Sequence, residues 1–199
     1  MKIYFYMVCM AVAFSSCGQP SASGNENTDA PEKTAAGPKL VINEADWVDT
    51  DLSGISNLTP ISVKLPKDAK LEKNGNGGVD ATINDFYVIS IGQPYASNLK
   101  ELIEGNKSLT IGRTSAYKNI KLFVDEPNGF VFTFQMQDEA NGFQYEPEAH
   151  FYYAIETEGG AHFSFQDSHS TFSVPGSSYP VENAKKVYEI IKKSAKVLE

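Results

Sequence analysis

Cysteine is almost absent from this 199-residue chain, which contains only Cys9 and Cys17. Both lie at the amino-terminal end, Cys9 inside an apolar run and Cys17 shortly after it. The rest of the sequence has no thiol with which to form a disulfide or bind a metal ion. The folded part must therefore be stabilised by its hydrophobic core, and its length of about 160 residues is that of one domain.

Basic residues are also scarce. Residues 40–179 contain nine Lys and Arg against nineteen Asp and Glu, and the whole chain has a formal net charge of −8. Because nucleic-acid binding depends largely on cations that neutralise phosphates, nucleic acid is not an expected partner. The same acidic balance argues against binding to anionic lipid headgroups. The sequence shows no internal repeat, phosphate-binding loop or nucleophile elbow.

Long apolar runs are missing except at the start of the chain, where one extends from Ile3 to Phe14. Its roughly twelve residues fall short of the roughly twenty that a membrane-spanning helix needs. Lys2 precedes the run and small residues follow it, which is the pattern of a cleaved secretory signal. The sequence therefore predicts a signal peptide over residues 1–16.

The end of this signal, Phe14-Ser15-Ser16-Cys17, resembles the lipobox of bacterial lipoproteins, although Leu or Ile is commoner where Phe14 stands. The resemblance implies that Cys17 becomes the first residue of the mature protein and carries a diacylglyceryl group and palmitate. Two or three acyl chains on one cysteine would hold the protein almost permanently at a membrane. By resemblance to known sorting signals, Gln19 in place of an Asp implies the periplasmic face of the outer membrane. The alternative is a plain secretory signal cleaved elsewhere.

A polar segment follows the cysteine. Residues 18–39 contain no apolar residue larger than Ala. Such a segment cannot offset the entropy of ordering by burying apolar surface. We therefore interpret residues 17–39 as the lipidated cysteine with a flexible tether, and residues 40–199 as a single domain.

The domain is predicted to consist of strands interrupted by one helix and closed by another. A short helix is expected over residues 95–104, stopped by Gly105, and a long one over residues 180–198. Residues 40–60 are expected to pack on this body as a lead-in. Antiparallel strands with a short inserted helix and a long C-terminal helix define an α+β fold. Strands are predicted over residues 61–65, 79–91 (a pair or one bent strand), 120–125, 130–137, 150–157 and 161–166.

This order of elements resembles the Mog1/PsbP-like fold, in which helices pack on an antiparallel sheet as a sandwich. The segments Asp-Leu-Ser at 51–53, Leu-Pro-Lys-Asp-Ala at 65–69 and His-Phe-Tyr-Tyr at 150–153 also resemble a family of small bacterial envelope lipoproteins of unknown function. The likeness covers about residues 45–198 and rests on structural motifs. It implies a fold without choosing a function.

Asp49, Asp51 and Ser53, followed by Gly54, match the opening of a calcium-binding loop, in which oxygen ligands at positions 1, 3 and 5 precede a glycine. The match fails at the twelfth position, where Pro60 stands instead of a bidentate Glu. No helix pattern flanks the segment. We expect an acidic turn here, and a calcium-stabilised structural lipoprotein is an alternative that rests on these residues alone.

Three histidines, His150, His162 and His169, accompany Asp167 in the last predicted hairpin. Imidazole and carboxylate together can bind zinc or activate a nucleophile. A shared apolar face requires paired residue numbers with an even sum such as 318, which places His150 opposite Ser168 and on the other face from Asp167. His162 and His169 would be roughly 23 Å apart on an extended strand. The sequence therefore predicts no metal site, no catalytic residue and no cofactor.

Aromatic residues outside the main core pattern are candidates for a contact surface. Phe143 and Tyr145 lie in an acidic segment, residues 138–148, that would suit a basic partner, and Tyr152 could line a ligand or protein surface. The sequence predicts a non-catalytic accessory or binding module whose ligand or protein partner is not specified. An envelope hydrolase that uses His150 or His169 is the alternative, and it requires a pocket in which a histidine is hydrogen-bonded to a carboxylate.

Overall fold

The computed structural model describes residues 41–57, 59–84, 87–112, 117–138, 143–144, 147–169 and 179–198. The predicted signal peptide, Cys17, the tether over residues 17–39 and Tyr145 lie outside the described residues, and so does the side chain of Phe143. All described residues belong to one unit of the chain. None of the helices in the described part is long and apolar enough to cross a bilayer.

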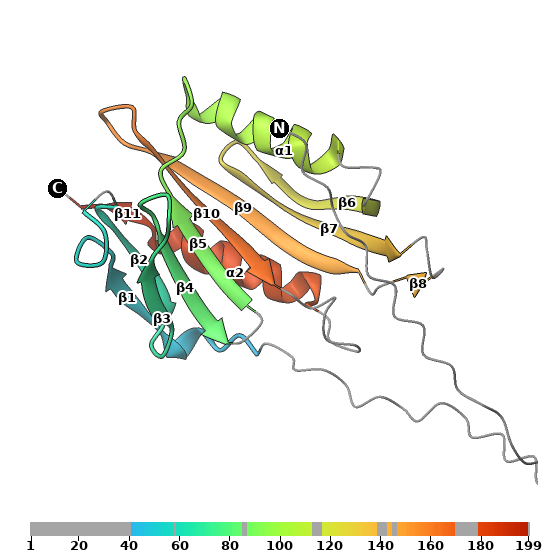
Figure 1. Cartoon of the computed structure of the whole chain (residues 1–199), viewed down its shortest axis with the longest axis horizontal. Helices are drawn as coiled ribbons and strands as arrows, with labels where there is room; N and C mark the ends of the chain where they lie inside the picture. Colours follow the sequence, from blue (N-terminus) through green and yellow to red (C-terminus); the bar gives the residue numbers. More distant parts are fainter. Residues whose placement is uncertain are drawn as a thin grey trace, which may run out of the picture. The chain divides into compact units, whose positions relative to one another are not determined.

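A large antiparallel sheet forms the centre of the fold (Figure 1). Among the described strands, the short strand β8 (Phe143–Gln144) pairs only with β7 (Gly129–Asp138) and lies outside the strand order given below. A second, three-stranded sheet has the order β1 (Trp47–Asp51), β2 (Ile61–Pro66) and β11 (Lys196–Val197), and a 3-10 turn at Glu44–Asp46 precedes it. In spatial order the large sheet contains β3 (Lys70–Lys73), β4 (Val79–Asn84), β5 (Tyr87–Gly92), β10 (His162–His169), β9 (Glu148–Glu156), β7 (Gly129–Asp138) and β6 (Tyr117–Glu126).

Two helices cover opposite faces of the large sheet (Figure 1). Helix α1 (Leu99–Gly112) begins after Asn98, whose side-chain Oδ1 accepts a hydrogen bond from the backbone N–H of Glu101 at 2.8 Å. Helix α2 (Val181–Ser194) lies on the other face. The alternation along β9 separates the two cores, because Phe151 belongs to the core that includes α2 and Tyr152 to the core beneath α1.

The core on the α2 side is the larger one. Apolar residues at helical spacing turn one face of α2 toward the sheet, and each large buried side chain stabilises the fold by about 1.5–3 kcal/mol. The smaller core lies beneath α1 and combines three phenylalanines of β7 with residues of α1 and β9. The buried residues of α2 are Ala184, Val187, Tyr188, Ile190 and Ile191, and the buried residues beneath α1 are Leu102, Ile103, Phe130, Phe132, Phe134, Tyr152 and Ala154.

The predicted fold class is confirmed: an antiparallel sheet carries a short inserted helix and a C-terminal helix, as in an α+β sandwich. The predicted register of the last hairpin is confirmed as well. Phe163 pairs with Ile155 and Phe165 with Tyr153, and each pair of numbers sums to 318. The hydrophobic alternation fixed this register because a slip of one residue would turn every side chain to the other face of the sheet.

Several elements differ from the prediction. Helix α1 extends to Gly112 instead of ending at Gly105, because an internal glycine costs only roughly 1 kcal/mol and the residues after it contact the sheet through Asn106 and Lys107. Helix α2 ends at Ser194, since the next residues pair with the free edge of β2. The lead-in contains a strand, β1, that shows no apolar alternation because Trp47 is its only buried residue.

Candidate functional site

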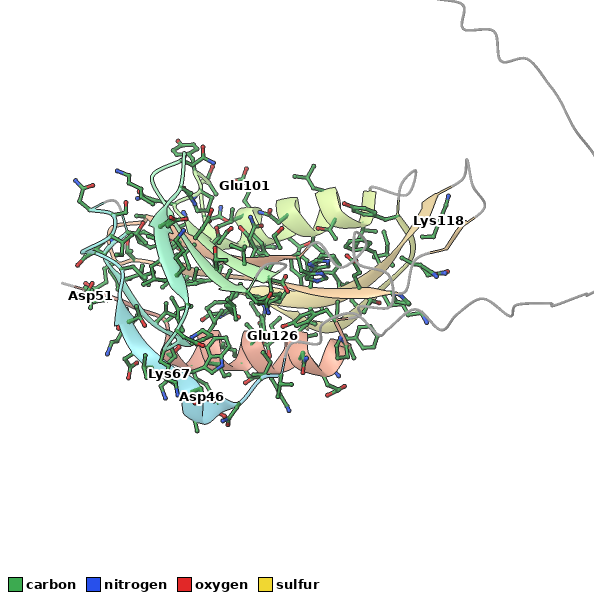
Figure 2. All side chains as sticks on the ribbon, turned by 60° about the horizontal axis from the view of Figure 1, so that its bottom comes forward. Asp46, Asp51, Lys67, Glu101, Lys118 and Glu126 are labelled. Atoms are coloured by element: carbon green, nitrogen blue, oxygen red, sulfur yellow. The ribbon has the colours of Figure 1, made fainter. Side chains whose placement is uncertain are left out.

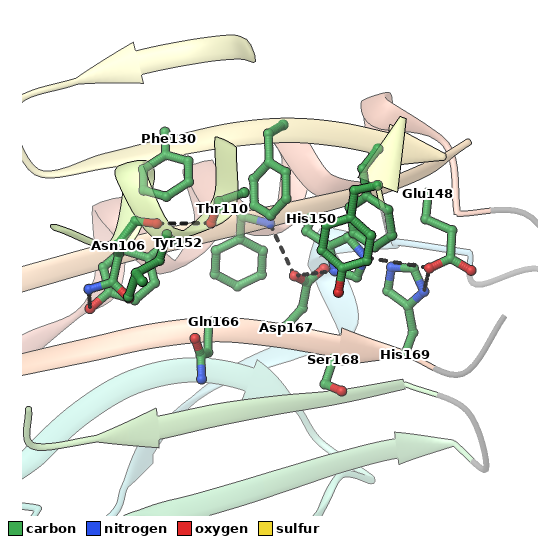
Figure 3. Close-up of a pocket in the computed structure, with 15 residues that line it drawn as sticks. Asn106, Thr110, Phe130, Glu148, His150, Tyr152, Gln166, Asp167, Ser168 and His169 are labelled. Carbon is green, nitrogen blue, oxygen red and sulfur yellow. Dashed lines mark hydrogen bonds and ion pairs between the residues drawn. The ribbon is translucent and has the colours of Figure 1, made fainter. Parts of the chain in front are cut away.

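A cavity of about 470 Å³ is lined jointly by α1 and by the sheet face that α1 covers (Figure 3). One wall is aromatic, α1 contributes a mixed wall, and one end is polar and buried except at Ser168. The aromatic wall consists of Tyr117, Phe130, Phe132, Phe134 and Tyr152, the helix contributes Asn106, Leu109 and Thr110, and the polar end contains Glu148, His150, Asp167, Ser168 and His169.

The aromatic wall follows from the period of two along β7. Phe130, Phe132 and Phe134 alternate with residues that point to the α2 side, so all three rings lie on the cavity side. The ring of Phe134 stacks on Tyr117 at 4.1 Å between centroids and on His150 at 5.0 Å. The wall is therefore continuous with the polar end.

Tyr152 belongs to this wall rather than to an open surface. It is only 6% exposed, its ring lies 5.7 Å from that of Phe130, and its hydroxyl accepts a hydrogen bond from Asn106 Nδ2 at 3.1 Å. Because α1 covers this face of β9, Tyr152 lines the cavity, and its predicted role in a ligand or partner surface stays a prediction. Its use as a partner surface together with Phe143 and Tyr145 stays untested, since those two side chains lie outside the described residues.

The polar end combines residues from two adjacent strands. Glu148 and His150 follow each other at a spacing of two on β9, and His169 ends β10. The rings of His150 and His169 stack at 4.0 Å with an interplanar angle of 2°. Glu148 Oε2 lies 3.6 Å from His150 Nε2 and 3.7 Å from His169 Nδ1. All three residues are buried, at no more than 9% exposure.

Asp167 holds His150 from the other side. Its Oδ1 accepts the backbone N–H of Phe151 at 3.0 Å and lies 3.2 Å from His150 Nδ1, while its Oδ2 accepts the hydroxyl of Tyr87 at 3.2 Å. The hydroxyl of Tyr179 in turn donates to that of Tyr87 at 2.9 Å. A carboxylate that accepts from three donors acts as an anchor for this end of the cavity.

The sequence kept His150 and Asp167 apart by placing them on opposite faces, but this contact shows that the two side chains meet. The pairing of β9 with β10 ends at Gln166 and Tyr152, and Asp167 lies one residue beyond. There its side chain takes the place of a strand partner for the N–H of Phe151. Asp167 still pairs with Ile89 of β5, so β10 continues as a strand, and the contact with His150 forms where β9 and β10 separate.

The pKa values of the two histidines are shifted in opposite directions. Burial by itself would lower the pKa of His150, but the carboxylates of Asp167 and Glu148 outweigh it and raise the pKa to about 9. Burial, together with the positive charge of His150, lowers the pKa of His169. At neutral pH and without a bound ion, His150 is therefore an imidazolium that stacks on a neutral His169.

Glu148, His150 and His169 meet the geometric condition for a metal site. One ligand atom of each lies within 4.8 Å of the others. The expectation that no three ligands converge is thus wrong. His162 does not belong to this group, as the sequence predicted, and its Nε2 lies 3.6 Å from Glu156 Oε1. The Glu148-x-His150 spacing on a strand was a usable signal, because residues two apart share one face of a sheet.

The other candidate, the acidic segment with Asp49, Asp51 and Ser53, has a different structure from a calcium loop. Asp49 lies inside β1, and Asp51 ends that strand at the edge of the molecule (Figure 2). Asp51 Oδ1 accepts hydrogen bonds from Ser53 N at 2.9 Å and Ser53 Oγ at 2.7 Å. These bonds are those of an acidic turn that ends a strand.

One condition of the hydrolase alternative is met, namely a pocket in which a histidine contacts a carboxylate. His150 lies in a pocket and contacts a carboxylate, so Asp167 is the orienting group that sequence reasoning did not find. Ser168 also lines the cavity, but no hydrogen bond joins it to His150 among the described residues. An imidazole with a pKa of about 9 is protonated at neutral pH and is a poor general base.

With the fold and this site in place, the class of protein is an α+β domain with a buried Glu-His-His cluster at the end of an aromatic cavity. No family model, curated protein or solved structure matches the chain.

Proposed function

We propose that this protein is a lipid-anchored, non-catalytic binding module of the bacterial envelope, and that it holds a small, largely apolar ligand in the cavity beneath α1. The observation that carries the proposal is the contrast within the cavity, where an aromatic wall leads to a buried polar end. Ligand sites typically combine apolar lining with a few convergent polar groups.

The size of the cavity supports this function. Its volume of about 470 Å³ lies within the roughly 300–1,000 Å³ that is typical of small-molecule sites. The stacked rings of β7 offer a flat apolar surface, which favours a planar ligand body. The polar end would fix the orientation of the ligand, because a buried polar group binds only a group that satisfies it.

The anchor and the resemblance to envelope lipoproteins support the proposed location. Lipidation of Cys17 would place the cavity near a bilayer, where apolar small molecules concentrate. The same proposal includes the periplasmic leaflet of the outer membrane, membership of the lipoprotein family and the Mog1/PsbP-like fold. The protonated state of His150 favours binding over hydrolysis, since general base catalysis needs a free imidazole.

The test uses N-phenyl-1-naphthylamine, a neutral fluorophore that brightens in apolar sites, added to the full chain in detergent. Energy transfer from Trp47, the only tryptophan, reports probe bound to the protein. Thr110→Phe fills the cavity from α1, and Ser108→Phe is the matched control, because Ser108 is exposed and does not line the cavity. We expect saturable transfer that Thr110→Phe abolishes and Ser108→Phe retains. Equal transfer in all three proteins would refute binding in this cavity.

A further inference from the structure

We propose that Glu148, His150 and His169 bind one divalent transition-metal ion of the zinc type at the polar end of the cavity. The inference is independent of the apolar ligand, because it rests on the ligand atoms of these three side chains and on the groups that hold them. Two imidazoles and one carboxylate are a common protein donor set for zinc, with a further position left for water or a ligand.

The distances fit a single ion. Zinc bonds to nitrogen and oxygen of roughly 2.0–2.2 Å place tetrahedral ligand atoms roughly 3.3–3.5 Å apart. Glu148 Oε2 lies 3.6 Å from His150 Nε2 and 3.7 Å from His169 Nδ1. The remaining pair lies within 4.8 Å. The two distances from the carboxylate oxygen therefore need to shorten by only a few tenths of an ångström, while the two ring nitrogens must also move closer to each other.

The carbonyl of Ala149 and the carboxylate of Asp167 determine which nitrogen of each histidine ring can bind the metal ion. His169 Nε2 must donate to the carbonyl of Ala149 at 3.0 Å, since a carbonyl can only accept, and this leaves the lone pair on Nδ1. Asp167 fixes the proton on His150 Nδ1 and leaves Nε2 to face Glu148. Histidine ligands of metals usually donate their other N–H to a carboxylate or a carbonyl, and both arrangements occur here.

His150 Nε2 gives a second, separate indication. It is buried, and it has no hydrogen-bond partner among the described residues. Burial of a polar nitrogen without a hydrogen bond is costly, and few such groups occur in native proteins. A metal ion at this nitrogen would satisfy it and draw Glu148 Oε2 closer.

Binding requires a change in ring orientation. The two imidazoles are parallel within 2°, so their lone pairs lie in separate, nearly parallel planes. An ion can lie in both planes only if the rings tilt toward each other. Rotation about the Cβ–Cγ bond of histidine is soft, which allows this tilt while Nδ1 of His150 stays near Asp167.

The experiment measures Zn²⁺ binding to the untagged full chain in detergent after metal removal with EDTA. A competing chromophoric chelator gives stoichiometry and affinity, and the visible absorption of added Co²⁺ reports coordination geometry. We expect one tight Zn²⁺ per chain and a Co²⁺ spectrum typical of four or five ligands. Absence of saturable Zn²⁺ and Co²⁺ binding to the unaltered chain would overturn the proposal, whatever the variants do.

The variants locate the ion. Glu148→Gln and His169→Gln should each weaken Zn²⁺ binding by at least tenfold, and the outer-shell change Asp167→Asn by roughly 10–100-fold. His162→Gln is the matched control, because His162 is equally buried on β10 but lies beside Glu156. Unchanged affinity in Glu148→Gln and His169→Gln would place the ion elsewhere and overturn the proposal. Zn²⁺ should raise the melting temperature of the unaltered chain, which tests the site even if a variant fails to fold.

The two proposals fail separately. Loss of fluorophore binding with intact Zn²⁺ binding would remove the apolar ligand and leave the metal site. Loss of Zn²⁺ binding with intact energy transfer from Trp47 would remove the metal site and leave the apolar ligand. Thr110→Phe, which contributes no metal ligand, should retain Zn²⁺.

Discussion

Asp167 Oδ1 lies 3.2 Å from His150 Nδ1, although alternation along the paired strands would place these two side chains on opposite faces of the sheet. The contact exists because the pairing of β9 with β10 ends one residue earlier, at Gln166 and Tyr152. The carboxylate then occupies the space where a strand partner would lie and accepts the N–H of Phe151. One side chain thus ends the ladder and orients a histidine.

We expect Asp167→Asn to destabilise the fold by about 3 kcal/mol, because it removes one partner of a buried charged pair. The amide can no longer accept from every donor that now surrounds the carboxylate. Urea denaturation at neutral pH, with fluorescence and circular dichroism as probes, measures the free energy of unfolding.

Asp49→Asn is the control for this change, since Asp49 is exposed on β1 and should alter stability by less than about 0.5 kcal/mol. If Asp167→Asn and Asp49→Asn have the same free energy of unfolding, Asp167 does not anchor this end of the sheet.

Tyr87→Phe should cost more stability than Tyr179→Phe. The Tyr87 hydroxyl both donates to Asp167 and accepts from Tyr179, so its removal breaks two buried hydrogen bonds, whereas Tyr179→Phe breaks one. With about 1 kcal/mol per bond, and more for groups left buried without a partner, we expect losses of about 2–3 and about 1 kcal/mol.

A double-mutant cycle by denaturation checks this relationship. The double variant Tyr87→Phe, Tyr179→Phe should be less destabilised than the sum of the two single changes, because both singles lose the same bond. Strict additivity would show that the two hydroxyls do not interact in solution.

The fold could be predicted from the sequence further than the site could. Burial on one face fixed the register of the last hairpin, and the apolar stripe fixed the helical nature of α2. The sum of 318 for Phe163 and Ile155 is a consequence of hydrophobic alternation alone. These properties repeat along the chain, so a few mismatches do not hide them.

The site depends on single events that do not repeat. His169 and Glu148 are 21 positions apart, and they meet only because β10 lies beside β9 and the ladder between them ends early. No pattern in the sequence marks the residue at which two strands stop pairing. The spacing of Glu148 and His150 on one strand could have indicated two of the three residues, but nothing indicated that His169 would stack on His150.

Glu126 links the sheet to α2, and its contribution should depend on pH. Its Oε2 accepts hydrogen bonds from Lys192 Nζ at 2.6 Å and the Tyr188 hydroxyl at 2.8 Å (Figure 2 shows its position). The bond from Lys192 holds the pKa of Glu126 below its usual value, against the opposing effect of burial. The ionised form is therefore favoured by folding, and its contribution is complete above the unfolded pKa and is lost as pH falls through the folded one.

We expect Glu126→Gln to lower the free energy of unfolding by about 1 kcal/mol at pH 7, a modest value because water screens this partly exposed pair. The difference from the unaltered protein should shrink as the pH falls below about 4, because Glu126 of the unaltered protein then becomes protonated. Urea denaturation across this range measures it. Glu158→Gln, in the exposed turn after β9, should show no such trend. A difference that stays constant down to pH 3 would contradict the role of the ionised carboxylate.

Cys17→Ser should release the protein from the membrane. If Cys17 carries two or three acyl chains, their burial at about 0.8 kcal/mol per methylene accounts for nearly all membrane affinity, because the acidic body has little attraction to anionic headgroups. Labelled palmitate should enter the unaltered protein and sediment with membranes, whereas the variant should take up no label and retain its uncleaved leader. Cys9→Ser, which changes the only other cysteine, should leave labelling intact. Label in the Cys17→Ser protein, or its loss in Cys9→Ser, would place the lipid on another residue.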